Sequence, residues 1–324
     1  MIRMYGAVVM VAMLGMFCSS NQQEPKDVSS HKIMFTSTLG GSKYPQVFSI
    51  NDDGTDTVRI TNGKGHYGAA RWSWDQLWIA AYSAGGASDL IAMDHDVIYL
   101  MNRRGDLVDS LLGCGYSGGG GFAWMGQSLK LCYPHTSFGT VSGYYFTSCE
   151  DRHCDREHES LIEVKDDSAS GKPIVLDGHP TDENRLLAKY QRKERKVVEG
   201  RTIVNYYWCL GEISVQGEAL LQIDRDQELN IRKARYSPDG KRIAYANGRT
   251  ITIIPLSNPK MPIDIHFCDD YDPTAFEWSP NSTDLAISLN QGTRSGIYLY
   301  HIQDQSVKPI ITSDTDQIFL CDYR

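Results

Sequence analysis

The chain lacks an excess of basic residues, and this absence argues against one large class of partners. Its 324 residues include 32 Lys and Arg against 40 Asp and Glu, which gives a formal net charge of -8 at pH 7. Nucleic-acid-binding domains usually carry a basic patch or stripe. The one basic run, Lys189 to Lys196, contains Glu194 and is interpreted as a solvated hairpin. We therefore expect no nucleic acid among its partners.

Long apolar runs are also missing, and so is any long helical pattern after the first twenty residues. The stretch from Met4 to Phe17 has fourteen residues without a charge, which is too short for an ordinary membrane-spanning helix. The rest of the chain consists of short runs rich in aromatic and β-branched residues, separated by turn residues. Runs of this kind predict an all-β protein.

What the sequence does contain is a repeat. The fullest copy, Tyr236 to Tyr245, reads Tyr-Ser-Pro-Asp-Gly-Lys-Arg-Ile-Ala-Tyr. Related copies begin at Trp72 and Trp278, and weaker copies begin at Trp124 and His179. A spacing of about 40 to 57 residues indicates an array of one supersecondary unit. Within each unit, Pro, Asp and Gly favour a tight turn between two strands, so these residues are assigned to turn formation.

Each unit is expected to contribute four short antiparallel strands, which is the composition of a propeller blade. Residues 32–61 supply the second, third and fourth strands of a blade, and residues 317–323 supply a first strand with nothing after it. Joining the two segments in one blade closes the ring and removes a free sheet edge. The sequence therefore predicts a six-bladed β-propeller closed by its N- and C-terminal strands.

These repeats resemble the TolB-like (PD40, WD40-like) propeller family over nearly all of residues 32–324. The copies at Tyr236 and Trp278, the strand Ile297–Tyr300 and the first unit, Lys32 to Ser37, carry the resemblance. It implies a six-bladed ring, in a family with many exported bacterial members. The α/β domain that precedes the propeller in TolB has no counterpart here. The resemblance therefore does not imply a role in the Tol system.

The N-terminal region predicts export. Residues 1–18 are interpreted as a signal peptide with Arg3 as its positive start, residues 19–30 as a polar tether, and residues 31–324 as the propeller. Cys18 directly follows the apolar stretch, as in bacterial lipoproteins, and is the predicted lipidation site. The expected location is the cell envelope, in the periplasm or at the outer membrane. Soluble secretion and a retained anchor remain alternatives.

Export permits disulfides, and the chain has eight cysteines. Without Cys18 their number is odd, which leaves at least one thiol free or intermolecular. Cys149 and Cys154 lie close together around a turn and are the first candidates for a disulfide. A bond between Cys114 and Cys132 is an alternative, because connectivity does not follow from sequence.

Two polar segments were considered as metal sites. The segment from Cys149 to His158 has two thiols and two imidazoles, but its spacing is not that of a known zinc site. Asn51 to Asp56 offers oxygen ligands without the spacing of a calcium loop, and it lies where the repeat needs a turn. We therefore expect neither a metal nor a cofactor.

The one weak catalytic candidate is His179, which has Asp177 and Asp182 beside it in the most degenerate repeat. Histidine with carboxylates is suited to general acid–base chemistry. This observation keeps open a polysaccharide lyase or hydrolase with its site at the channel mouth. The leading expectation is a non-enzymatic binding or scaffold module for a protein, peptide or glycan partner. A structural module paired through its odd cysteine is a third reading.

The repeat copies that match the motif least well suggest where a specific function lies. The divergent stretch runs from Cys114 to Trp208, and Trp208 with Tyr206 and Tyr207 falls outside the repeat pattern. Because these aromatic residues are not needed for the repeated core, we interpret them as part of an exposed contact surface.

Overall fold

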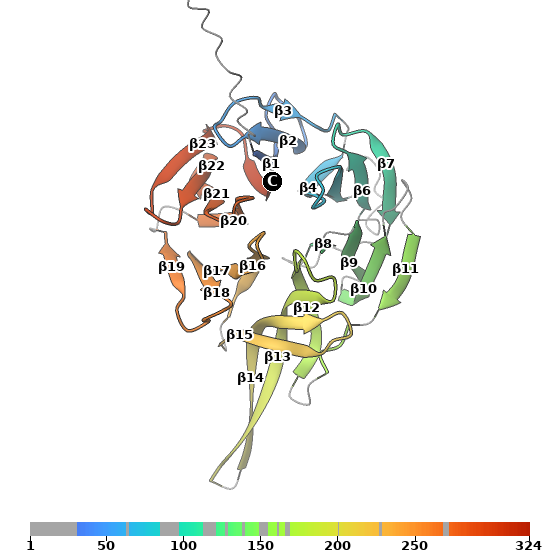
Figure 1. Ribbon diagram of the computed structural model, residues 1–324, viewed down its shortest axis with the longest axis vertical. Helices are drawn as coiled ribbons and strands as arrows, with labels where there is room; N and C mark the ends of the chain where they lie inside the picture. Colours follow the sequence, from blue (N-terminus) through green and yellow to red (C-terminus); the bar gives the residue numbers. More distant parts are fainter. Residues whose placement is uncertain are drawn as a thin grey trace, which may run out of the picture.

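The computed structural model describes residues 31–62, 65–84, 97–112, 121–126, 129–137, 140–148, 155–160, 162–165, 169–199, 201–226, 229–267 and 272–324. They form 24 strands in six sheets of four strands each. Figure 1 shows the sheets as a ring, and we name them blades A to F in order round it. The expected six-bladed β-propeller is confirmed. Within the described ranges, no helix has the length and apolarity to cross a membrane.

In each blade, consecutive strands of the sheet run from the centre of the ring outwards. Blade A contains β24 (Ile318–Tyr323), β1 (Lys32–Ser37), β2 (Gln46–Asn51) and β3 (Val58–Arg59). Blade B contains β4 (His66–Trp72), β5 (Trp78–Ala84), β6 (Val97–Asn102) and β7 (Leu107–Leu112), and blade C contains β8 (Ala123–Met125), β9 (Lys130–Ser137), β10 (Thr140–Ser148) and β11 (Asp155–Ser160). Blade D contains β12 (Ala169–Gly178), β13 (Arg185–Val198), β14 (Arg201–Ser214) and β15 (Ala219–Asp226). Blade E contains β16 (Ile231–Tyr236), β17 (Arg242–Asn247), β18 (Thr250–Pro255) and β19 (Ile263–His266), and blade F contains β20 (Asp272–Trp278), β21 (Asp284–Gln291), β22 (Arg294–His301) and β23 (Val307–Ser313).

The ring closes in blade A as the sequence predicts. Strand β24 pairs antiparallel with β1, and Ile33 lies opposite Tyr323. The backbone N–H of Lys32 donates to the carbonyl of Arg324 at 2.6 Å, and the N–H of Arg324 donates to the carbonyl of Lys32 at 2.9 Å. The two ends of the described chain are therefore held together by backbone hydrogen bonds, and β24 covers the edge of β1 that would otherwise be unpaired.

The hydrophobic core is divided among the interfaces between blades. Six clusters of buried side chains each draw on two neighbouring blades. The aromatic residue that leads a repeat lies in the interface with the preceding blade, as Trp72 does between blades A and B and Trp278 between blades E and F. Full burial of one such side chain contributes about 1.5 to 3 kcal/mol. The repeated aromatics are thus core residues, as expected.

Blade D departs from this pattern because Gly178 takes the place of the aromatic. A Cβ atom at Gly178 would lie only 2.5 Å from the carbonyl oxygen of Trp124. Blade C and blade D therefore approach each other through backbone at this point. The weak repeat at His179 reflects a real local change in packing.

The Ser-Pro-Asp-Gly turns have the same construction in different blades. The hydroxyls of Ser73, Ser237 and Ser279 donate to the side chain two residues later, at 2.5, 2.6 and 2.6 Å. The third residue after each serine has a positive φ: 59° at Gln76, 66° at Gly240 and 63° at Ser282. These motif residues are therefore turn formers, as the sequence indicates.

Candidate functional site

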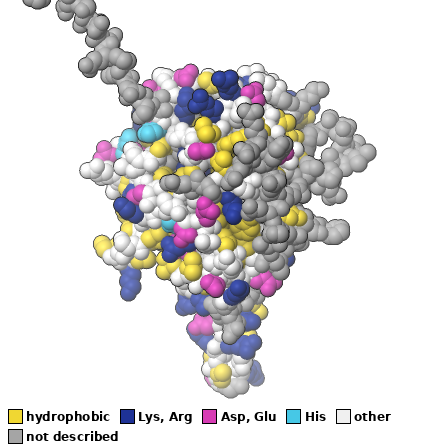
Figure 2. Space-filling view, turned by 45° about the vertical axis from the view of Figure 1, so that its right-hand side comes forward, with side chains coloured by type: hydrophobic (Ala, Val, Ile, Leu, Met, Phe, Trp, Pro, Cys, Tyr) yellow, Lys and Arg dark blue, Asp and Glu magenta, His cyan; other side chains and the backbone are white. Residues whose placement is uncertain are grey.

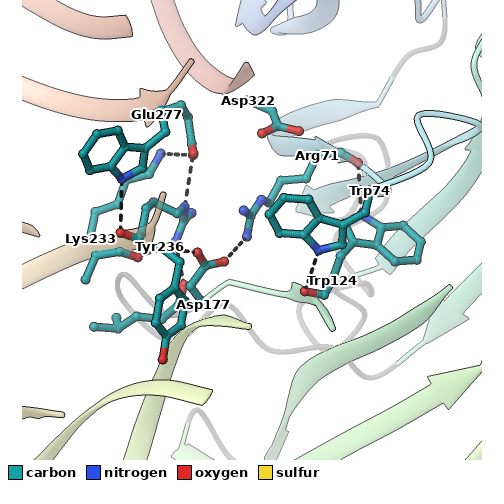
Figure 3. A network of polar contacts seen from close by, with 12 residues as sticks. Arg71, Trp74, Trp124, Asp177, Lys233, Tyr236, Glu277 and Asp322 are labelled. Atoms are coloured by element: carbon teal, nitrogen blue, oxygen red, sulfur yellow. Dashed lines mark hydrogen bonds and ion pairs between the residues drawn. The ribbon is translucent and has the colours of Figure 1, made fainter. Parts of the chain in front are cut away.

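A charged group occupies the centre of the ring, and the repeat itself places it there. The residue that precedes the leading aromatic, or its equivalent, lies in the inner strand of each blade. These six residues are Arg71, Ala123, Asp177, Arg235, Glu277 and Asp322. Five of the six carry a charge, and Figure 3 shows labelled members of the group pointing towards one another. We call these residues, together with Lys233, the central cluster.

An ion pair crosses the centre between blades B and D. Arg71 Nη1 lies 2.9 Å from Asp177 Oδ1, and their side chains are 6% and 3% exposed. The pair joins two blades that are not neighbours, since blade C lies between them. The other oxygen of Asp177 accepts the backbone N–H of Tyr236 at 3.0 Å, which ties blade D to blade E. Burial opposes the charge of Arg71, but Asp177, Glu277 and Asp322 outweigh it and raise the pKa of Arg71.

Glu277 forms ion pairs with two cations from blade E. Its Oε1 lies 2.7 Å from Lys233 Nζ and 3.1 Å from Arg235 Nε. Burial alone would raise the pKa of Glu277, but Lys233 and Arg235 overcome that effect and lower the pKa to about 2. Burial also lowers the pKa of Lys233, although Glu277 opposes this shift. The carboxylate is therefore ionised at neutral pH and is already bound by protein cations.

Asp322 joins blade A to blade B. Its Oδ2 accepts the backbone N–H of Trp72 at 2.8 Å, in the same way that Asp177 accepts the N–H of Tyr236. The indole N–H of Trp124 donates to the carbonyl of Arg71 at 3.3 Å and adds a link between blades B and C. The central cluster thus connects neighbouring blades, although Arg71 Nε and Asp322 Oδ1 are buried without a hydrogen bond among the described residues.

His179 follows β12 and replaces the serine of the turn. Its Nδ1 accepts the backbone N–H groups of Thr181 at 3.3 Å and Asp182 at 3.1 Å. Its ring packs edge-on against Tyr236 with centroids 4.9 Å apart, and it is 7% exposed. Burial lowers the pKa of His179 and favours the neutral imidazole.

The two carboxylates near His179 are directed elsewhere. Asp177 binds Arg71, and Asp182 Oδ2 lies 3.7 Å from Arg185 Nε. No hydrogen bond between His179 and a carboxylate is found among the described residues. The geometry assigns His179 a part in the turn, and its catalytic role remains a prediction without support from this arrangement.

Most of the cysteines considered for lipidation or disulfides are not among the described residues. Cys18, Cys149, Cys154 and Cys114 lie outside the described residues. Cys132 is a buried free thiol, so the alternative disulfide with Cys114 is wrong. Burial raises the pKa of Cys132 and raises the pKa of Cys321 to about 11, so neither thiol is reactive.

The segment from Asn51 to Asp56 forms the turn between β2 and β3, as expected. Asp53 Oδ1 accepts the backbone N–H of Thr55 at 2.9 Å and its hydroxyl at 2.6 Å. In the part of the chain that the structure describes, no group of three His, Cys, Asp or Glu side chains is arranged to hold a metal ion.

The second candidate site is a hairpin of blade D that extends beyond the ring. Strands β13 and β14 pair over their full length, with Val198 opposite Arg201 at the tip. The pairing with β12 ends at Arg192, and the pairing with β15 ends at Trp208. Residues 193–198 and 201–207 therefore form a two-stranded extension, which Figure 1 shows projecting from the ring. We call these residues the hairpin extension.

The two faces of the hairpin extension differ in charge. Side chains alternate along a strand, and residues paired across two strands share a face. One face, which we call the basic face, carries Lys193, Arg195, Val197, Thr202, Val204 and Tyr206 and has no Asp or Glu. Val197 is 73% exposed and Tyr206 is 50% exposed. On the opposite face, Lys196 Nζ lies 3.9 Å from Glu194.

The base of the hairpin is anchored, whereas its outer part is not. Lys189 Nζ lies 4.5 Å from the centroid of the Trp208 ring, and Arg192 donates to Gln222 Oε1 at 2.8 Å. Residues 189–201 contain six basic and two acidic side chains, in a chain with a net charge of -8. Figure 2 shows Lys and Arg side chains along this projection. The basic run and the aromatic residues, each evident in the sequence, lie on paired strands of this hairpin.

Comparison with known proteins gives structural matches only. No family model matches the sequence, and no curated protein matches it. The structure is similar to TolB from Acinetobacter baumannii, with a TM-score of 0.59 and 13% identity over 92% of this chain and 67% of that one. It is also similar to a putative TolB from Agrobacterium tumefaciens, with a TM-score of 0.56 and 11% identity over 91% of this chain and 99% of that one.

A third similar structure is a chain of a nidogen/laminin complex, with a TM-score of 0.55 and 7% identity over 91% of this chain and 97% of that one. Identities this low establish the fold and leave activity open. The chain therefore has the fold of a TolB-like six-bladed β-propeller.

Proposed function

We propose that the protein is an exported, envelope-associated, non-enzymatic binding module that holds a protein partner through the hairpin extension of blade D. The observation that carries this proposal is the basic face, where exposed apolar and cationic side chains stand together without an acidic neighbour. The proposal narrows the expected protein, peptide or glycan partner to a protein with an acidic surface.

The shape of the hairpin supports recognition rather than core formation. Residues 193–198 extend about 20 Å beyond the last pairing with β12 at ordinary strand rise. A two-stranded ribbon has little stability of its own, and its unpaired edges and exposed apolar side chains are liabilities in a free protein. A partner that covers Val197, Val204 and Tyr206 would remove these liabilities.

The chemistry of the basic face supports a protein partner. Tyr and Arg are enriched among the residues that dominate binding energy in protein interfaces. Lys193 and Arg195 would guide an acidic surface towards Tyr206 and raise the association rate at low salt. A ribbon edge also allows a strand of the partner to add by backbone hydrogen bonds.

The central cluster supports the non-enzymatic part of the proposal. Arg71, Glu277 and Asp177 neutralise one another or their neighbours, so their charges are used to hold blades together. The lyase or hydrolase alternative is not supported by a comparable observation.

For location, we propose residues 1–18 as the signal peptide, Cys18 as the lipidation site, and residues 19–30 as a tether in the periplasm or at the outer membrane. Labelling with a fatty-acid analogue that is lost in Cys18→Ala would test the anchor.

Site-specific photo-crosslinking tests the binding surface. A photoreactive amino acid replaces Tyr206 on the basic face or, as the matched control, Tyr298 of blade F in the full-length protein. We expect a discrete protein adduct in envelope extract from position 206 and not from position 298. The adduct should diminish at least about tenfold in Lys193→Glu/Arg195→Glu and fall with added salt. Equal adducts from both positions, or an adduct indifferent to charge reversal, would reject the proposal.

A further inference from the structure

A pocket between blades A and B has a lining with a strong excess of positive charge. Its volume is about 510 Å³, within the range of small-molecule sites. The charged residues that line it are Lys32, Arg59, Arg103, Arg104, Arg324 and a single acid, Asp75. It lies apart from the hairpin extension, because every lining residue belongs to blades A and B or to their connecting turns.

The acids near this pocket are already engaged. Asp75 Oδ1 accepts the hydroxyl of Ser73 at 2.5 Å and the backbone N–H of Leu77 at 3.0 Å, so it serves its own turn. Asp56 lies 3.0 Å from Lys32 Nζ, and this ion pair offsets the positive charge that Lys32 adds to the pocket lining. Arg59 donates from Nε to the carbonyl of Thr61 at 2.8 Å, a neutral partner. Three arginines, Arg59, Arg103 and Arg104, have no acidic partner among the described residues.

Arg324 supplies an independent sign of a missing partner. Its side chain is only 9% exposed, and its guanidinium carbon lies 4.0 Å from the centroid of the Trp74 ring. Asp322 Oδ2 is 3.6 Å from Arg324 Nε, too far for a hydrogen bond. Arg324 Nε and Nη2 are buried and make no hydrogen bond. Buried donors are nearly always satisfied in native proteins, so these two point to a ligand or an ordered water.

We propose that the blade A–B pocket binds a phosphate group, either of a phosphorylated small molecule or of a lipid headgroup. A phosphate carries up to two negative charges and three acceptor oxygens, which suits several guanidinium groups better than a single carboxylate does. Arg324 provides the buried contact, and Arg103 and Arg104 provide the exposed ones. The apolar part of the wall, which includes Trp72 and Ile60, leaves room for the organic part of the ligand.

Binding is tested on the full-length protein by calorimetric titration with inorganic phosphate, phenyl phosphate and acetate. We expect saturable binding of both phosphates at low salt and at least about tenfold weaker binding of acetate. The intrinsic fluorescence of Trp74 should change on binding, because Arg324 stacks on its ring. Vesicles with and without phosphatidylglycerol form the second arm, and they distinguish a lipid headgroup from a soluble ligand.

Variants assign the binding to this pocket. Arg103→Ala/Arg104→Ala changes only exposed turn side chains and should weaken phosphate binding at least about tenfold. Arg324→Met keeps an apolar stem against Trp74 and should weaken it further. The matched control Lys241→Ala/Lys260→Ala removes two exposed cations far from the pocket and should leave binding unchanged.

Two outcomes would overturn the proposal: no saturable phosphate or vesicle binding by the parent protein, or equal binding by the parent and Arg103→Ala/Arg104→Ala. The hairpin variant Lys193→Glu/Arg195→Glu should bind phosphate like the parent protein. Failure of the partner proposal and failure of the phosphate proposal are thereby distinguished.

Discussion

The central cluster and the hairpin extension both contain charged side chains, but these side chains have different roles. In the centre, Arg71 and Glu277 are buried, and each lies within hydrogen-bond distance of an oppositely charged group. On the basic face of the extension, Lys193 and Arg195 have neighbours that are apolar or cationic. The charges in the centre bind one another and hold the ring together. The charges of the extension remain available to bind another molecule.

The largest expected effect comes from removing one half of a central ion pair. Asp177→Ala leaves Arg71 without its carboxylate and the backbone N–H of Tyr236 without its acceptor. Breaking a buried pair in this way destabilises a protein by about 3 to 5 kcal/mol. Urea unfolding, followed by tryptophan fluorescence, measures the loss.

A double variant provides the control for this effect. Arg71→Met/Asp177→Asn removes both charges and keeps an acceptor for Tyr236, so it should regain part of the lost stability. If Asp177→Ala unfolds at the same urea concentration as the parent protein, the ion pair does not stabilise the ring and the contrast with the extension fails.

Acid should weaken the centre through Glu277. Its folded-state pKa of about 2 lies below the ordinary value of 4.5, so the unfolded chain binds a proton more readily. The stabilisation is complete above the unfolded pKa and is lost as pH falls from about 5 towards 2. A shift of this size corresponds to about 3 kcal/mol. The free energy of unfolding, measured from pH 7 to pH 3, should fall more steeply for the parent protein than for Glu277→Gln; equal slopes would contradict the assignment.

A smaller effect is expected at the turn of blade D. His179→Ala removes the acceptor of two backbone N–H groups and should destabilise by about 1 kcal/mol, whereas His179→Asn retains an acceptor and should recover most of it. Because burial lowers the pKa of His179, its contribution is present above about pH 6.5 and is lost as pH falls below that value.

The readout is the stability difference between the parent protein and His179→Asn at pH 8 and at pH 5.5. We expect the free energy of unfolding of the parent protein, relative to that of His179→Asn, to be lower at pH 5.5 than at pH 8. Loss of a glycan-degrading activity in His179→Asn, with stability unchanged, would instead support the catalytic prediction for this residue.

The fold was predictable because its signal is local and repeated. Each Ser-Pro-Asp-Gly turn lies within a few residues of the strands that it joins, and blade closure follows from incomplete units at 32–61 and 317–323. The partners in the centre were not predictable, because Arg71 and Asp177 are 106 residues apart and belong to blades that are not neighbours. Their contact is seen only in the assembled ring.

The extension and the blade A–B pocket also depend on contacts that could not be predicted from the sequence. The basic run beginning at Lys189 and the aromatic residues ending at Trp208 were each identified, but their pairing across the turn at Glu199 is seen only in the structure. Nothing in the sequence singled out Arg324 or Arg103. They approach the same pocket only because blade A contains the last strand of the chain and lies beside blade B.

The smallest effect on stability, and the sharpest test of the comparison, belongs to the extension. Lys193→Glu/Arg195→Glu reverses the charges of the half-buried Lys193 and the exposed Arg195, which make no described ion pair, so the free energy of unfolding should change by no more than about 0.5 kcal/mol. The same urea titration used for Asp177→Ala provides the measurement. The variant should nevertheless lose the crosslinked partner, because its basic face becomes acidic. A loss of stability comparable to that of Asp177→Ala would show that these charges support the fold, and the distinction between a structural centre and a recognition arm would then collapse.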